Sequence, residues 1–153
     1  MKADVTLYVV NYNYGEYLEQ CLVSVAAQTL QPCEVLVFDN GSTDGSIEII
    51  ERLRLEFPDF KFIQRQKSGL IPTIKEVIKI TNSKYIMRLD ADDFAEPKLL
   101  ECLYQAAEKN QNCSLCYPDY YEVDQDGILI QKVTKLSLNE TSLPDIPPHG
   151  ACT

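Results

Sequence analysis

Three carboxylates lie within four residues near the middle of the chain, in Asp90-Ala91-Asp92-Asp93. They follow Tyr85-Ile86-Met87-Arg88-Leu89, a segment that reads as a buried strand. Alternation along an extended backbone places Asp90 and Asp92 on one side, where two carboxylates can share a cation. Mg²⁺ or Mn²⁺ bound this way keeps its other positions for water and diphosphate oxygens. The segment therefore predicts a metal and phosphate site, and a solvated acidic turn before Pro97 is the alternative.

A polar loop, Asn11-Tyr12-Asn13-Tyr14-Gly15, follows the apolar run Val5 to Val10. It offers side-chain amides and a flat aromatic face directly before a predicted helix N-terminus. Such a loop can hold a nucleobase or a phosphate. The alternative interpretation is an asparagine helix cap beside a core tyrosine.

A third polar segment, Asp39-Asn40-Gly41-Ser42-Thr43-Asp44, follows the predicted strand Glu34 to Phe38. A carboxylate in this position can accept a hydrogen bond from a nucleobase N–H or a ribose hydroxyl. Ser, Thr and Asp are also the residues that helix starts select, so a cap and turn is the alternative.

The surrounding pattern alternates strands with helices, which predicts an α/β fold with a mostly parallel central sheet and helices on both faces. Strands are expected at 5–10, 34–38, 60–63, 85–89 and 114–117, and helices at 16–28, 44–57, 72–81 and 97–109. Residues 120–123 and 128–133 read as an antiparallel hairpin that turns at Gly127. Ligands of parallel sheets bind outside the carboxyl ends of the strands, so the three polar segments are expected at one edge.

Composition restricts the partners. The chain has 153 residues and a net charge of −9, from 14 Lys and Arg against 23 Asp and Glu, without a basic cluster. This argues for one globular domain and against nucleic acid as a partner. The first apolar run has six residues, too few for a signal peptide or a membrane span, so we expect a cytoplasmic protein.

Six cysteines without a secretory signal indicate buried, reduced thiols rather than disulfides. A competing arrangement is a zinc site made by Cys113-x-x-Cys116 and His149-x-x-Cys152. Because Cys116 falls in a predicted strand, packing is the favoured role for that pair.

Several segments in order resemble glycosyltransferase family 2, the inverting enzymes of GT-A fold, over about residues 4–150. The matching segments are Val5 to Leu18, Ser24 to Thr29, Glu34 to Ser46 and Tyr85 to Asp93. The Ser68-Gly69-Leu70 segment is similar to a glycine-containing loop of that family. Two positions differ from it: Val10 stands where many members have proline, and Ile74 where many have arginine.

The resemblance implies a nucleotide-diphosphate sugar, most simply a UDP-sugar, as donor, with Mg²⁺ or Mn²⁺ as cofactor. Tyr12 would lie against the base, Asp39 or Asn40 would contact uracil or ribose, and Asp92 would bind the metal on the diphosphate. Asp90 would contact the ribose or the metal. The expected nucleotide-binding residues are Val10, Asn11, Tyr12, Asp39, Asn40, Gly69, Asp90 and Ala91, and the expected metal ligands are Asp92 and Asp90.

The resemblance also implies a general base that deprotonates an acceptor hydroxyl, and the family supplies it from a segment well beyond the Asp-x-Asp motif. We therefore expect residues 1–136 to be the donor-binding domain and residues 137–153 to begin an acceptor-side segment, with the base beyond Thr153 in a longer protein. The acceptor would be a glycan or a lipid-linked glycan in cell-surface polysaccharide synthesis. Attachment to the inner face of a membrane through further C-terminal parts stays open.

Two other classes remain open. One is a non-catalytic α/β module that keeps nucleotide or partner binding without the reaction. The other is a nucleotidyltransferase, which would favour a glycine-rich loop with a basic residue after the first strand. Asn11 to Gly15 contains no basic residue.

Overall fold

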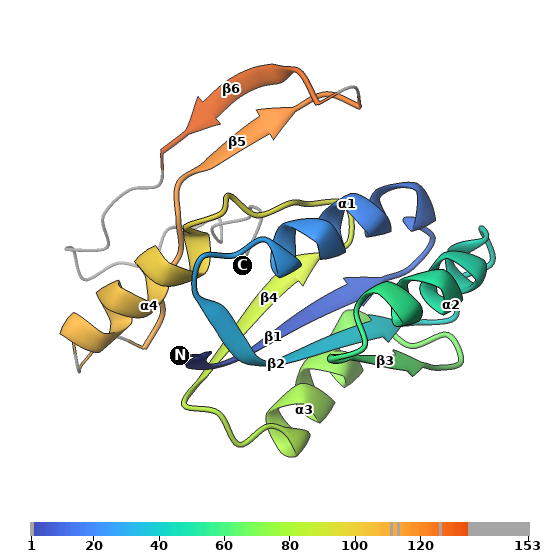
Figure 1. Ribbon diagram of the computed structural model, residues 1–153, viewed down its shortest axis with the longest axis horizontal. Coiled ribbons are helices and arrows are strands. Elements are labelled where there is room, and N and C mark those ends of the chain that lie inside the picture. Colours follow the sequence, from blue (N-terminus) through green and yellow to red (C-terminus); the bar gives the residue numbers. More distant parts are fainter. Residues whose placement is uncertain (1, 111, 113, 126, 135–153) are drawn as a thin grey trace.

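A parallel sheet with a helix after each strand forms the body of the protein (Figure 1). The computed structural model describes residues 2–110, 112, 114–125 and 127–134. The sheet order is β3-β2-β1-β4, with β1 at Lys2–Asn11, β2 at Gln31–Asp39, β3 at Phe60–Gln64 and β4 at Tyr85–Asp90. The helices are α1 at Gly15–Ala26, α2 at Ser46–Glu56, α3 at Leu70–Ile80 and α4 at Leu99–Lys109. The predicted α/β class is confirmed.

The central strands are apolar on both faces because helices cover both faces. In β1, Leu7 and Val9 pack into the cluster formed with α1, α2 and α4, whereas Tyr8 packs into a second cluster with Val77 of α3. Figure 1 shows α3 on the opposite side of the sheet from α1 and α2. Continuous apolar runs in β1 and β2 therefore reflect two-sided burial, and they made these strands readable from the sequence.

The register brings the polar strand ends to one edge. Asn11 at the end of β1 lies opposite Asp39 at the end of β2, and Val10 lies opposite Asp90 at the end of β4. Asp39 in turn lies opposite Gln64 at the end of β3. Parallel pairing thus places all three predicted polar segments at the carboxyl edge of the sheet, as expected.

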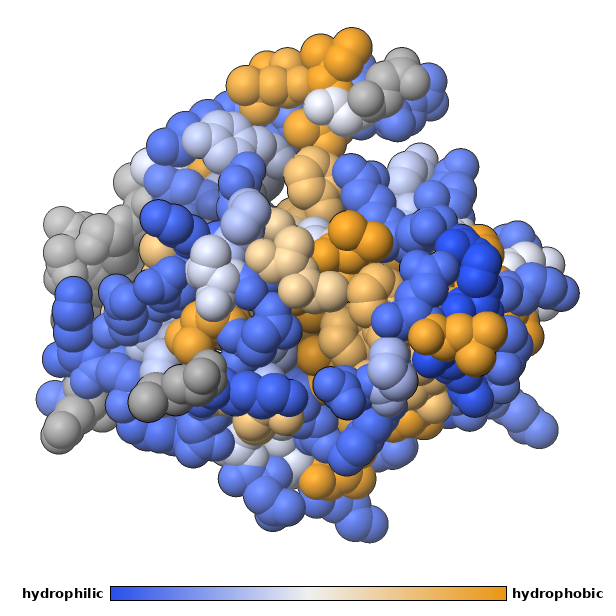
Figure 2. All heavy atoms as spheres, viewed as in Figure 1, coloured by the Kyte–Doolittle hydropathy of each residue, from blue (hydrophilic) through white to orange (hydrophobic). Residues whose placement is uncertain are grey.

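A separate hairpin follows α4, made of β5 at Tyr120–Val123 and β6 at Leu129–Val133 in antiparallel pairing. Gly127 has φ of 77°, and its N–H donates to the carbonyl of Asp124 at 2.9 Å. The predicted hairpin and its glycine turn are confirmed. Figure 2 shows apolar side chains gathered on this hairpin, where Ile128, Leu129 and Ile130 are exposed.

Several expectations are wrong. Residues 114–117 form no strand: a run of four residues does not specify a partner, and β4 has no second neighbour within the described part of the chain. β2 begins at Gln31 rather than Glu34, because Pro32 is tolerated near the start of a strand. Cys33 and Cys102 are exposed rather than buried, whereas Cys21 is buried as expected.

Two expectations lie wholly or mainly outside the described residues. The first is the acceptor-side segment at residues 137–153, and the second is the zinc site, of whose four residues only Cys116 is described. Among the helices that are described, none is both long enough and apolar enough to cross a membrane.

Candidate functional site

Asp39 organises the turn after β2 from a buried position. Its side chain is 1% exposed, and both of its carboxylate oxygens accept hydrogen bonds. Oδ1 accepts from the Asn11 amide at 2.8 Å, and Oδ2 accepts from the backbone N–H groups of Gly41 and Ser42, both at 3.1 Å. Hydrogen bonds from two backbone N–H groups and one amide hold a buried carboxylate and fix the turn around it.

Asn40 connects the same turn to α3. It is 2% exposed, and its Nδ2 donates to Thr73 Oγ1 at 3.1 Å. The hydroxyl of Thr73 also lies 3.2 Å from the carbonyl of Gly69, at the start of α3. The Gly69 loop is therefore held against the end of β2 by buried polar contacts. The structure brings Asp39, Asn40 and Gly69 together, with the side chains of Asp39 and Asn40 turned inward.

Asn11 joins the first loop to the second. Its side chain is fully buried, and its Nδ2 donates both to Asp39 and to Ser42 Oγ, the latter at 3.1 Å. Ser42 Oγ also accepts from the Asn13 N–H at 2.9 Å, and Asn13 Oδ1 accepts from the Thr43 N–H at 2.8 Å. Asn11 Oδ1 is buried and has no hydrogen-bond partner within the described residues. These hydrogen bonds join the two loops into one polar surface.

Tyr12 presents its ring to solvent from this surface. Its side chain is 39% exposed, and the ammonium of Lys67 lies 5.4 Å from the ring centroid. An exposed aromatic face beside a cation suits a planar base and a nearby phosphate. The predicted position of Tyr12 at the edge is thus consistent with base stacking.

Lys67 and Arg65 were missed by the sequence analysis. The Arg65 N–H donates to the carbonyl of Asp39 at 3.0 Å, and its guanidinium lies 4.4 Å from the Phe38 ring centroid. Both basic residues follow β3, which ends at the same edge as Asp39. That position was the available signal, because a strand end can be found from the sequence.

Gly41 allows the second loop to approach the segment after β3. Its φ is 86°, and a Cβ at this position would lie 2.7 Å from the backbone N of Lys67. The glycine is therefore required both by its conformation and by the close backbone contact.

Arg88 holds Asp90 on the other side of the site. Its Nε donates to Asp90 Oδ1 at 2.9 Å, and its Nη2 forms an ion pair with Asp90 Oδ2. Val10 and Ala91 lie beside this pair, where the Ala91 N–H donates to the carbonyl of Val10 at 3.3 Å. The carboxylate predicted to contact ribose or metal is thus already engaged by a cation of the chain itself.

Asp92 and Asp93 form no direct ion pair of this kind with the described residues, although the charge of Arg88 acts on Asp93 from a distance. Asp92 is exposed, and its carboxylate makes no hydrogen bond or ion pair with the described residues. Burial first, and then the neighbouring charges of Asp92 and Asp90, raise the pKa of Asp93 to about 6, against a smaller lowering by Arg88. A divalent cation would relieve this crowding. Within the described residues, no three acidic, His or Cys side chains are grouped to bind a metal, so any ion here needs ligands from elsewhere.

A cavity of about 490 Å³ adjoins Asp92 and Asp93 and extends to the hairpin. Its walls also include Phe94, Tyr120 and Tyr121. The acidic turn therefore lies between this aromatic-lined cavity and the polar surface that the loops after β1 and β2 form.

Comparison with protein families identifies the family to which this chain belongs. The model for glycosyl transferase family 2 matches residues 6–146. The chain belongs to this family. The resemblance noted in its motifs is thereby confirmed.

Relatives in the family include larger enzymes. Chondroitin synthase of Escherichia coli is 29% identical over 126 residues, which make up 82% of this chain and 18% of that protein. Glycosyltransferase GlyG of Streptococcus pneumoniae is 29% identical over 125 residues, 80% of this chain and 41% of the relative. The chain therefore spans less than half the length of these family 2 relatives.

Solved structures agree on the GT-A fold. S. aureus TarS 1-349 has a TM-score of 0.59 and 26% identity, covering 72% of this chain and 33% of that one. Mannosyltransferase PcManGT from Pyrobaculum calidifontis, solved with GDP-Man and Mn²⁺, has a TM-score of 0.53 and 23% identity, covering 61% and 29%. The latter likeness concerns the fold alone.

Proposed function

We propose that this chain binds the donor of an inverting glycosyltransferase, a nucleoside-diphosphate sugar with UDP as the favoured nucleotide. One observation carries the proposal: the ends of β1, β2 and β4 bring Tyr12, the Asp39 turn and the acidic turn to a single edge. A base, a ribose and a diphosphate need these three kinds of surface in that order. The relative TarS has been solved in complex with UDP and with UDP-GlcNAc, which supports the choice of donor.

In this proposal, Tyr12 and Lys67 receive the base and the first phosphate. Asp39, Asn40 and Asn11 shape that surface from below, since their hydrogen bonds are directed into the protein. Contacts from Asp39 or Asn40 to the ribose or uracil remain part of the proposal, because each carboxylate or amide oxygen can accept more than one hydrogen bond. Val10, Gly69 and Ala91 contribute backbone to the same surface.

Mg²⁺ or Mn²⁺ would be held by Asp92, with Asp90 as the second candidate ligand. The exposed Asp92 carboxylate and the charge crowding at Asp93 fit such an ion. A metal with one or two carboxylate ligands takes its remaining ligands from water and the diphosphate. When bound, the ion would stabilise the charge that develops on the departing diphosphate.

The acceptor and the base belong to the whole protein. We propose that a hydroxyl of a glycan or lipid-linked glycan attacks the anomeric carbon, and that a general base beyond residue 153 takes its proton. The relatives include chondroitin synthase, which supports a role in polysaccharide synthesis. Cytoplasmic location and any membrane attachment of the longer protein are part of the same proposal.

Thermal unfolding with nucleotides tests the proposal. UDP with Mn²⁺ at about 100 times Kd should raise Tm by roughly 5–10 °C, because ligand binding stabilises only the folded chain. UDP without Mn²⁺ should raise it much less. If the folded protein shows no shift with UDP, dTDP or GDP in the presence of Mn²⁺, donor binding is wrong and a non-catalytic module is the better interpretation.

A further inference from the structure

The cavity beside the acidic turn lies outside the proposed base and ribose surface. Its volume of about 490 Å³ is within the range of sites that take small molecules. Asp92 and Asp93 form one end, and Tyr121 and Val123 of β5 line the hairpin side. The loops after β1 and β2 contribute none of its described lining residues. The cavity therefore begins at the proposed metal position and is separate from the groups that would hold the nucleoside.

Two aromatic side chains on its walls are exposed. Phe94 follows the acidic turn and is 40% exposed, and Tyr121 lies in β5 and is 52% exposed. Exposed aromatic rings in a concave site offer flat apolar surface. The aliphatic C–H groups on one face of a sugar ring pack against such a surface, while its hydroxyl groups need hydrogen-bond partners from other walls.

Carboxylates supply these hydrogen-bond acceptors. The charged side chains among the described lining residues are all acidic, namely Asp92, Asp93, Glu96 and Asp119. Ionised carboxylates accept hydrogen bonds from hydroxyl groups and donate none. Lys132 lies close by, with its ammonium 3.8 Å from Asp119 Oδ2 and 6.0 Å from the Tyr121 ring centroid, so it offsets one of these charges in part. The walls keep an excess of negative charge, which suits a neutral, hydroxyl-bearing ligand and disfavours an anion.

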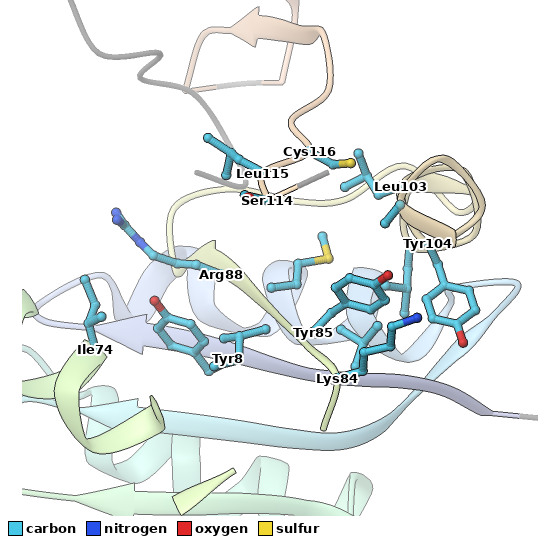
Figure 3. A pocket seen from close by; sticks show the side chains of 15 residues that line it. Tyr8, Ile74, Lys84, Tyr85, Arg88, Leu103, Tyr104, Ser114, Leu115 and Cys116 are labelled. Atoms are coloured by element: carbon cyan, nitrogen blue, oxygen red, sulfur yellow. The ribbon is translucent and has the colours of Figure 1, made fainter. Parts of the chain in front are cut away.

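The acidic lining is a property of this cavity and not of the whole chain. A second cavity, of about 510 Å³, lies along β4, and Figure 3 shows Lys84 and Arg88 on its walls. No carboxylate is among the described residues that line this second cavity. A net charge of −9 therefore does not place acidic groups in every cavity of the chain.

We propose that the cavity beside the acidic turn binds the ring of a neutral sugar and discriminates against uronic acids. Phe94 and Tyr121 pack against the C–H face of the ring, and carboxylates such as Glu96 accept hydrogen bonds from its hydroxyl groups. A uronic acid adds a carboxylate among these groups, where repulsion and loss of hydration weaken its binding. The interpretation as a sugar site rests on the proposed function, and it adds the class of sugar that the site takes. The ring belongs either to the donor or to the acceptor.

Titrations of the 153-residue chain with matched glycosides, followed by nuclear magnetic resonance, test the proposal. The neutral probes are methyl β-glucopyranoside and methyl β-galactopyranoside, and each is paired with its uronide, which differs only by a carboxylate at C6. Without nucleotide or metal, at least one neutral glycoside should shift the backbone amides of residues 94–96 and 120–123. Its uronide should bind at least about tenfold more weakly. Equal binding of glycoside and uronide overturns the proposal, as does the absence of shifts with both neutral glycosides at about 100 mM.

Substitutions assign the effect to the walls of the cavity. Tyr121→Ala should weaken binding of the neutral glycoside about fivefold or more, because the ring loses its packing surface. Glu96→Gln should reduce the preference for the neutral glycoside over its uronide about threefold, because an amide of similar size replaces one carboxylate. Leu55→Ala, at an 84% exposed position on α2, is the control and should change neither value. An unchanged preference in Glu96→Gln together with unchanged binding in Tyr121→Ala contradicts the proposal.

UDP with Mn²⁺ separates this proposal from the proposed function. A chain that binds the neutral glycosides at the cavity but does not bind UDP contradicts only the proposed function. A chain that binds UDP with Mn²⁺ but shows no shift at the cavity with either neutral glycoside contradicts only the sugar site. UDP-GlcNAc with Mn²⁺ then identifies the source of the ring, since a donor sugar displaces the glycoside, whereas an acceptor sugar binds together with UDP-GlcNAc. Both of these last results support a neutral sugar in the cavity.

Discussion

At the scale of single residues, the carboxylates of the site divide into two kinds. Asp39 is buried and accepts three hydrogen bonds, so its charge serves the shape of a turn. Asp93 is half-buried among other carboxylates, and burial first, then Asp92 and Asp90, raises its pKa to about 6. The first kind stabilises the fold. The second kind experiences repulsion from neighbouring carboxylates, which a bound cation would reduce.

The raised pKa of Asp93 predicts a pH-dependent gain in stability from Asp93→Asn. The folded-state pKa lies above the ordinary value of 3.8, so the charged form is penalised in the folded state above pH 6 and the penalty vanishes below about pH 4. Asp93→Asn should therefore raise the free energy of unfolding by about 1 kcal/mol at pH 7.5, after allowance for solvent screening. Urea unfolding at pH 7.5 and pH 4 measures this. The exposed, distant Asp59→Asn is the control, and a gain that is equal at both pH values contradicts the prediction.

The contact between Arg88 and Asp90 predicts that Arg88 competes with a divalent cation for the Asp90 carboxylate. Because Arg88 engages both oxygens of Asp90, Arg88→Gln should release this carboxylate and remove a nearby positive charge. Mn²⁺ affinity in the absence of nucleotide should then rise about three- to tenfold, which corresponds to roughly 1 kcal/mol. Calorimetric titration with Mn²⁺ measures it. Arg52→Gln, which removes an exposed ion pair with Glu19, is the control. Unchanged or weaker Mn²⁺ binding in Arg88→Gln would rule out the competition.

At the scale of elements, the site depends on loops that follow parallel strands. The loops after β1 and β2 are joined by Asn11, Asn13 and Ser42, and the segment after β3 approaches them closely at Gly41. The strands fix where these loops begin, and the hydrogen bonds between loops fix their shape.

Two glycines allow the cost of a close backbone contact to be measured apart from the cost of a positive φ. Both Gly41 and Gly127 have positive φ, at 86° and 77°. A Cβ added at Gly41 would lie 2.7 Å from the backbone N of Lys67, whereas a Cβ added at Gly127 would have no such neighbour within 4 Å. Gly127→Ala should cost about 1 kcal/mol of unfolding free energy, and Gly41→Ala at least about 2 kcal/mol more. Denaturant unfolding of both variants measures the difference. Equal losses would show that the contact with Lys67 does not constrain the loop.

The sequence predicted most of the elements and the common edge for a physical reason. Runs such as Val5 to Val10 are apolar on both faces, which is the pattern of a buried parallel strand. The inward direction of Asp39 and Asn40 could not be predicted, because the same side chains serve as caps, turn formers or ligand contacts. The position of Lys67 over Tyr12 depends on tertiary packing across three loops. The prediction of a strand at residues 114–117 was wrong, because a strand forms only beside a pairing partner and the local sequence pattern does not specify that partner.

At the scale of the whole molecule, charge is the main constraint on function. The chain has a net charge of −9, yet the proposed ligand is an anion. The ammonium of Lys67 lies 5.4 Å from the ring centroid of Tyr12, the predicted base contact, and Arg88 is paired with Asp90. Diphosphate binding at the acidic turn should therefore require a divalent cation. Metal dependence of nucleotide binding is thus the strictest test of the proposed function.

Calorimetric titration of UDP, with Mn²⁺ and with chelator, tests this consequence most directly. We expect UDP to bind the wild-type chain in Mn²⁺ and to bind at least about tenfold more weakly in chelator or in Asp92→Asn, because the bridging ion is lost. Asp59→Asn should bind UDP as the wild-type chain does. UDP binding of equal strength with Mn²⁺, with chelator and in Asp92→Asn would contradict the account.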